Sequence, residues 1–117
     1  MKSYTLLRVS SIVTALFAAG HTFGAPWTPV KDAPENALIG SMQSLRFPVL
    51  GSQRTYWDFY VGFGVSVSVY VFALAILLWQ VASLAKADPQ RARPMMLTFL
   101  AAFVAENHFD LAGKDHV

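Results

Sequence analysis

Residues 59–85, FYVGFGVSVSVYVFALAILLWQVASLA, contain no charged side chain and only one strongly polar one, Gln80. A helix rising about 1.5 Å per residue would make this stretch roughly 40 Å long, whereas the hydrocarbon core of a bilayer needs only about 20 apolar residues. Five valines between residues 61 and 71 alternate with other residues, a period typical of a strand. Because a lone strand in lipid would leave its backbone groups unpaired, we predict a transmembrane helix over about residues 56–85.

Two tryptophans lie near the ends of this stretch. Trp57 and Trp79 are 22 positions apart, which is about 33 Å on a helix. Tryptophan is enriched at both membrane interfaces, so we expect one indole in each headgroup layer and Trp27 as a further interface anchor. Chance placement in an aromatic-rich chain is the alternative.

The overall composition agrees with a membrane protein. Of the 117 residues, 55% are hydrophobic and 14% are charged, against about 25% charged in a soluble domain. The nine lysines and arginines flank the apolar segments and form no patch, which argues against nucleic acid as a partner. The absence of cysteine excludes a disulfide framework, a thiolate nucleophile and a cysteine metal site.

A first apolar segment covers about residues 5–24 and begins beside Lys2 and Arg8. We interpret it as an uncleaved transmembrane helix, with the Arg8 side chain as an anchor that reaches back to the cytoplasmic headgroups. The alternative is a signal peptide cleaved after Gly20. Against cleavage, a second hydrophobic span follows rather than a soluble domain.

The two connections differ in character. Residues 25–55 hold most of the prolines and polar residues and predict an outer loop, with a short amphipathic helix over about residues 33–47 that begins at Asp32-x-x-Glu35. Residues 86–93 contain three basic side chains and one acid, which predicts a cytoplasmic loop by the positive-inside rule. The amino end then also lies in the cytoplasm, as two crossings require.

A third apolar run over about residues 94–105 is too short to cross a bilayer alone, and residues 106–117 are polar and charged. We expect a partial third transmembrane helix and a polar tail. Either the carboxyl end is truncated or frame-altered, or the run is a short re-entrant helix. Within the tail, Glu106, His108 and Asp110 alternate, so their side chains would come together only on an extended chain. We therefore predict no metal site from these residues and His116.

Polar residues that end the first span and open the second carry the functional hypothesis. The ligand-binding candidates are His21, Arg54, Tyr56, Trp57 and Asp58. By topology His21 and Asp58 lie level at the outer interface, where an imidazole beside a carboxylate would form a proton relay or a polar ligand anchor. The competing interpretation is structural, because Thr55 and Asp58 fit the Ser/Thr-x-x-Asp/Glu capping pattern.

Two motifs stand at the loop-side ends of the two apolar segments: Gly20-His21-Thr22-Phe23-Gly24 ends the first, and residues 54–64, RTYWDFYVGFG, open the second. They resemble the motifs of a family of small, functionally uncharacterised bacterial membrane proteins with four expected helices. The resemblance covers about residues 4–104. It implies an uncleaved first helix and places the ligand-binding candidates where the polar motif residues of the family fall. It implies no activity, and the chain departs from the family pattern after about Val104.

Taken together, these features predict an all-α protein of the bacterial inner membrane. We expect a transmembrane helical hairpin or bundle with a short amphipathic loop helix, a partial third transmembrane helix and a cytoplasmic amino end. Its partners are the lipid bilayer and, through faces of small residues, a neighbouring helix. No cofactor is expected. Because no catalytic constellation appears, a structural or accessory role is favoured over small-molecule or lipid binding at the outer interface, and over an oligomeric channel or transporter.

Overall fold

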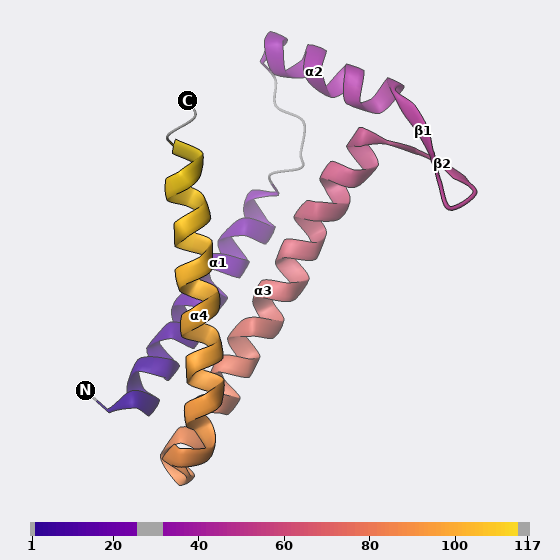
Figure 1. Ribbon diagram of the computed structural model, residues 1–117. Helices are drawn as coiled ribbons and strands as arrows, with labels where there is room; N and C mark the ends of the chain where they lie inside the picture. Colours follow the sequence, from indigo (N-terminus) through magenta and orange to yellow (C-terminus); the bar gives the residue numbers. More distant parts are fainter. Residues whose placement is uncertain (1, 26–31, 115–117) are drawn as a thin grey trace. The chain divides into compact units, whose positions relative to one another are not determined.

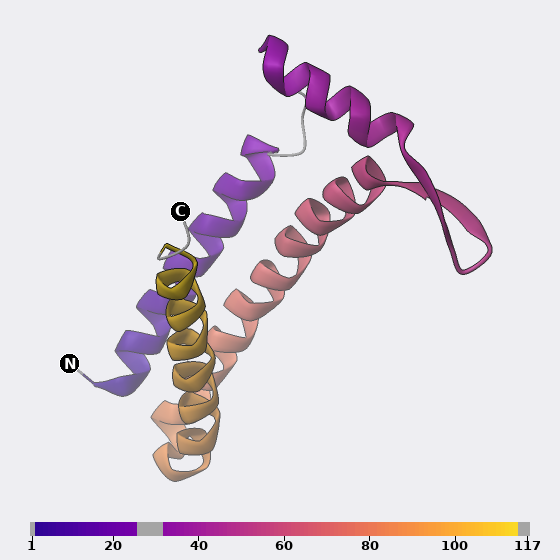
Figure 2. The same cartoon turned by 45° about the horizontal axis from the view of Figure 1, so that its top comes forward.

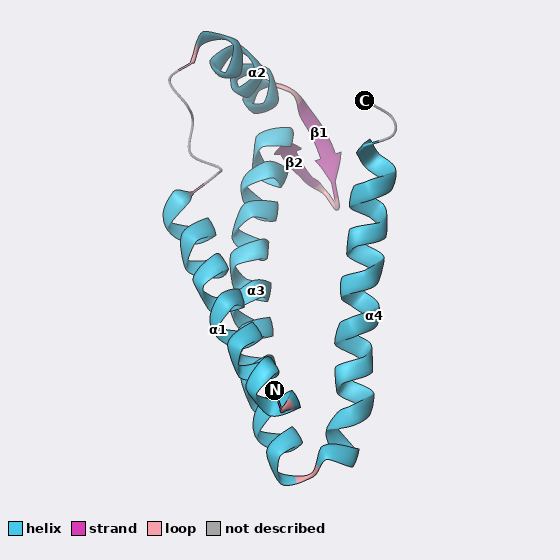
Figure 3. Ribbon diagram, turned by 90° about the vertical axis from the view of Figure 1, so that its left-hand side faces the viewer, coloured by secondary structure: helices cyan, strands magenta, loops and turns pink. Residues whose placement is uncertain are grey.

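The computed structural model describes residues 2–25 and 32–114. The elements are, in chain order, α1 (Ser3–Gly24), α2 (Ala33–Ser44), β1 (Arg46–Val49), β2 (Ser52–Thr55), α3 (Tyr56–Ala87) and α4 (Pro89–Lys114) (Figure 1 and Figure 3). Most of the described residues belong to these four helices. The mainly helical class expected from the sequence is therefore confirmed, with one small sheet added.

The chain forms two compact units, and α1 and α3 each contribute to both. The first, called here the α4 unit, comprises Met1–Ile12 and Ala75–Val117. It contains the start of α1, the end of α3 and all of α4. The second, called here the hairpin unit, comprises Val13–Leu74. It contains the remainder of α1, α2, the two strands and the start of α3.

Helices α1 and α3 are, within the described part of the chain, the two that are long and apolar enough to cross a membrane. α3 runs for 32 residues, so the valine alternation near its start does not make a strand. Its end is set by the sequence, because Pro89 disfavours a helical conformation at Asp88. Length and helix-forming residues thus decide the conformation here.

Small side chains make up the interior. In the α4 unit the buried cluster consists of Val81, Ala85 and Ala92. Among the described residues no large side chain is fully buried, whereas Phe63 and Tyr70 in the hairpin unit are 72% and 74% exposed. This distribution is the reverse of the one in a soluble domain, where large apolar side chains fill the core.

A β-hairpin between α2 and α3 was not expected from the sequence. The predicted loop helix is present, but it ends three residues early because the chain becomes extended at Leu45. β1 and β2 pair antiparallel, with Val49 opposite Ser52 (Figure 2). Leu50 and Gly51 between them both have positive φ, 47° and 81°, the combination that a type I′ hairpin turn requires.

Helix α4 continues through residues for which a polar tail was expected. The prediction of a tail over residues 106–117 is wrong up to Lys114, where α4 ends. A change from apolar to polar side chains does not by itself end a helix. Beyond Pro94 the chain contains good helix formers and no further proline. The Asn107 side chain also donates a hydrogen bond to the Phe103 carbonyl oxygen at 2.9 Å, inside the helix.

Candidate functional site

Helix α3 begins at a capping box. The Thr55 backbone N–H donates to Asp58 Oδ2 at 3.0 Å, and the Asp58 backbone N–H donates to Thr55 Oγ1 at 3.1 Å. Two backbone donors at the start of the helix are thereby satisfied, and the capping interpretation of these residues is confirmed. The same arrangement fixes the position of the Asp58 carboxylate.

The Asp58 carboxylate lies in the first turn of α3. A negative charge in the first turn also interacts favourably with the positive end of the helix.

An open groove of about 550 Å³ lies beside the capping box. It is lined by Val49, Arg54, Asp58, Phe59, Gly62, Phe63, Ser66 and Tyr70. Along α3 the lining repeats every four residues from Asp58 to Tyr70, so the groove follows one face of the helix. A Cβ atom added at Gly62 would meet nothing within 4 Å, which leaves the floor of the groove open at that point.

An aromatic cluster holds the hairpin on α3. The Phe47 ring centroid lies 4.8 Å from that of Tyr56 and 5.5 Å from that of Phe59. Phe47 pairs with Arg54 across the hairpin, so this packing positions Arg54 at the end of the groove. Neighbouring Trp57 instead stacks on Tyr60, with 5.4 Å between ring centroids.

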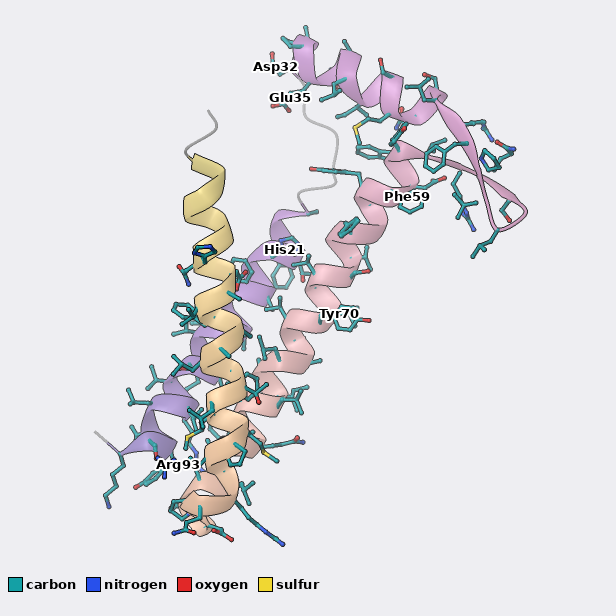
Figure 4. The ribbon with its side chains drawn as sticks, in the orientation of Figure 1. His21, Asp32, Glu35, Phe59, Tyr70 and Arg93 are labelled. Atoms are coloured by element: carbon teal, nitrogen blue, oxygen red, sulfur yellow. The ribbon has the colours of Figure 1, made fainter. Side chains whose placement is uncertain are left out.

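His21 on α1 contacts a different turn of α3. Its Nε2–H donates to the Gly64 carbonyl oxygen at 3.0 Å, and its ring stacks on Phe17 with 6.2 Å between centroids. The hydroxyls of Thr22 and Ser68 are hydrogen-bonded at 2.9 Å close by. Figure 4 shows His21 directed toward α3 and Tyr70 on the opposite side of α3.

The groove brings together two of the five ligand-binding candidates, Arg54 and Asp58. Gly64, which accepts the hydrogen bond of His21, follows Asp58 by six residues, or about 9 Å along the helix axis. These hydrogen bonds thus lie at different turns of α3, and a relay between His21 and Asp58 stays a prediction. Tyr56 and Trp57 belong to the aromatic contacts outside the groove lining, and the expected anchor Trp27 lies outside the described residues.

The groove itself was missed in the sequence, although a signal for it exists. Gly62, Ser66 and Tyr70 follow Asp58 at steps of four, the spacing of one helical face. What the spacing does not predict is the hairpin that closes the groove on one side.

Aromatic and basic side chains meet in the α4 unit. The Arg8 guanidinium carbon lies 4.8 Å from the ring centroid of Trp79, and the Lys86 ammonium lies 5.5 Å from that of Tyr4. Because the later residue on α1 contacts the earlier one on α3, the two helix segments run antiparallel within this unit. Both contacts fall within the range of cation–π attraction.

No metal site is apparent within residues 2–25 and 32–114, since no group of three His, Cys, Asp or Glu side chains could hold an ion there. His108 lies at one end of a shallow hollow on α4, beside apolar residues that include Leu97, Leu100 and Val104. These side chains offer no further ligand.

Comparisons with known proteins found no match for this chain among models of protein families, curated proteins or solved structures. The family suggested by the two motifs therefore stays a prediction. The functional argument rests on side-chain distribution and contacts.

Proposed function

We propose that the protein is an integral membrane protein in which α1 and α3 form a transmembrane hairpin with a structural or accessory role. The carrying observation is the exposure of its large apolar side chains. Leu16, Phe63 and Tyr70 are 67%, 72% and 74% exposed. In the most apolar segments of α1 and α3, only 11% and 17% of the residues are buried. A soluble core helix of such hydropathy would be mostly buried, whereas lipid makes the same exposure favourable.

The contacts between α1 and α3 support the same proposal. In the α4 unit the Ser11 hydroxyl donates to the Ala75 carbonyl oxygen at 2.6 Å, and in the hairpin unit Thr22 and Ser68 are hydrogen-bonded. Interfaces of small and hydroxylated side chains are typical of helices that associate within lipid. Because α1 supplies these contacts in both units, they favour a retained first helix over a cleaved signal peptide.

The basic residues of the α4 unit favour one orientation. The Tyr4 ring centroid lies 6.0 Å from the Lys2 ammonium and 5.5 Å from the Lys86 ammonium. The amino end and the end of α3 therefore lie on one side, together with the basic residues Arg91 and Arg93. The positive-inside rule assigns that side to the cytoplasm, which leaves α2 and the β-hairpin outside.

A reporter fusion scan tests this topology. We expect a compartment-sensitive reporter fused after residue 30 to be active outside the inner membrane, and the same reporter fused after residue 90 to be active in the cytoplasm. The opposite pattern would contradict the orientation. Loss of the first helix from the mature fusion, seen as a chain shortened by about 20 residues, would contradict the retained α1.

The groove favours a second candidate function, the binding of an amphiphile with an anionic head. At one end of the groove, the guanidinium N–H groups of Arg54 can donate two parallel hydrogen bonds to an anionic head. The Asp58 carboxylate already accepts a hydrogen bond from the Thr55 backbone. From Asp58 the groove extends along α3 to Tyr70, about 18 Å on a helix. Phenylalanines on this face would contact an alkyl chain.

A further inference from the structure

Arg8 has an incomplete set of hydrogen bonds. Its Nε atom is buried and has no hydrogen-bond partner, and one face of its guanidinium is directed at the Trp79 ring, 4.8 Å from the centroid. A guanidinium has five N–H donors and no acceptor. Leaving a buried donor of a charged group without an acceptor is costly, so the geometry favours an acceptor brought by a bound molecule.

Two further cations lie around the ring of Tyr4 on the same helix as Arg8. Tyr4 precedes Arg8 by one helical turn on α1, and the ammonium groups of Lys2 and Lys86 lie 6.0 Å and 5.5 Å from its ring centroid. Lys86 follows Trp79 by seven residues, or about two turns, so these two side chains share one face of α3. Three positive charges are thus gathered around two aromatic rings.

The positive charge of this cluster is not neutralised by the chain. Among the side chains that the structure describes, no carboxylate forms an ion pair with Lys2, Arg8 or Lys86. Asp88, the nearest acid along the chain, accepts a hydrogen bond from the Arg91 backbone N–H at 3.3 Å, in the first turn of α4. The cluster therefore offers net positive charge to an anion.

We propose that Lys2, Arg8 and Lys86 bind the phosphate of an anionic phospholipid headgroup. Guanidinium and phosphate form bidentate, charge-assisted hydrogen bonds, and basic pockets between helices on the cytoplasmic side suit anionic lipids. The inference rests on the membrane insertion proposed above. Lys86 directly follows the uncharged stretch of α3, so insertion brings this cluster to the headgroup layer, with Tyr4 and Trp79 as interfacial side chains.

Lipid binding to the full-length protein in mild detergent tests the proposal. Phosphatidylglycerol and phosphatidylcholine with the same acyl chains are titrated separately, and bound lipid is counted by native mass spectrometry. We expect the wild-type chain to bind phosphatidylglycerol at least about fivefold more tightly, and Arg8→Gln to lose at least about fivefold of that affinity, since each basic side chain near an anionic surface contributes roughly 1 kcal/mol. Arg8→Lys keeps the positive charge but loses the planar guanidinium, so we expect its affinity for phosphatidylglycerol to lie between those of the wild-type chain and Arg8→Gln.

Three controls separate the sources of binding. Lys114→Gln removes the same charge from the last residue of α4, and we expect it to leave the lipid preference unchanged. Lys86→Gln is a second test should Arg8→Gln fail to fold, and we expect it to lower the preference as well. Inorganic phosphate, a free ion with the same chemistry, is expected not to displace phosphatidylglycerol at equal concentration.

Several outcomes would overturn the site. They are equal binding of the two lipids by the wild-type chain, an equal loss in Lys114→Gln and Arg8→Gln, and displacement of the lipid by inorganic phosphate. A chain that needs detergent but shows no lipid preference would refute this site alone. A chain that is monodisperse in buffer without detergent would instead refute the membrane insertion on which the site rests.

Discussion

Asp58 stabilises the first turn of α3 through its side chain, because its Oδ2 accepts a hydrogen bond from the Thr55 backbone N–H at 3.0 Å. Asp58→Ala removes this acceptor, a loss worth about 1 kcal/mol at a helix start. We expect hydrogen exchange at the Thr55 amide to become roughly fivefold faster in this variant. Unchanged exchange at that amide would contradict the capping role.

The hydroxyl of Thr55 provides the matched variant for this prediction. Thr55→Ala removes the acceptor for the Asp58 backbone N–H, a loss worth about 1 kcal/mol at a helix start. Hydrogen exchange at that amide should then become roughly fivefold faster. Ser52→Ala, on the exposed strand β2, should leave exchange at the Thr55 and Asp58 amides unchanged.

Helix α3 presents different surfaces on its different faces. The face that includes Ser68 packs on α1 through small and hydroxylated side chains, whereas the face from Asp58 to Tyr70 lines the groove. A helix can separate these roles because residues four apart share a face. Packing and ligand binding can accordingly be altered independently along one element.

Substitution of Gly62 tests the groove as a binding surface. Leucine at position 62 meets no atom within 4 Å of its Cβ, favours the helix relative to glycine, and would occupy the floor of the groove. Excluding about two methylene groups of a bound chain, at about 0.8 kcal/mol each, should weaken the binding of radiolabelled palmitate in nonionic micelles about tenfold. Gly20→Leu on α1 also meets open space and is expected to leave binding unchanged. Equal effects of the two variants would exclude the groove.

Across the whole molecule, the sequence predicted what depends on local pattern. The long uncharged stretch of α3, the start of α2 after Asp32 and the capping box are encoded in neighbouring residues. The β-hairpin was missed because Leu50 adopts a positive φ that a leucine rarely takes, and Pro48 argues against a strand. The predicted third helix was shorter than α4 because only its apolar run was assigned to the helix.

The candidate site was only partly predictable for a different reason. Arg54 and Asp58 were found because they are close in sequence to the start of α3. The contacts of His21 with Gly64 and of Arg8 with Trp79 join residues far apart in the chain, and their partners depend on how α1 and α3 face each other. Such pairs follow from packing geometry, which a single sequence does not specify.

Membrane crossing by α3 is the central claim, and the absence of cysteine in this chain permits a direct test of it. Single cysteines at positions 52, 69 and 90 are exposed to a membrane-impermeant maleimide, first in cells with a permeabilised outer membrane, then after the inner membrane is broken open, and finally after solubilisation in detergent. The account predicts that Ser52→Cys is labelled at once, that Gln90→Cys is labelled only when the inner membrane is broken, and that Val69→Cys stays protected until detergent is added. Labelling of Val69→Cys as rapid as that of Ser52→Cys in intact membranes would contradict it.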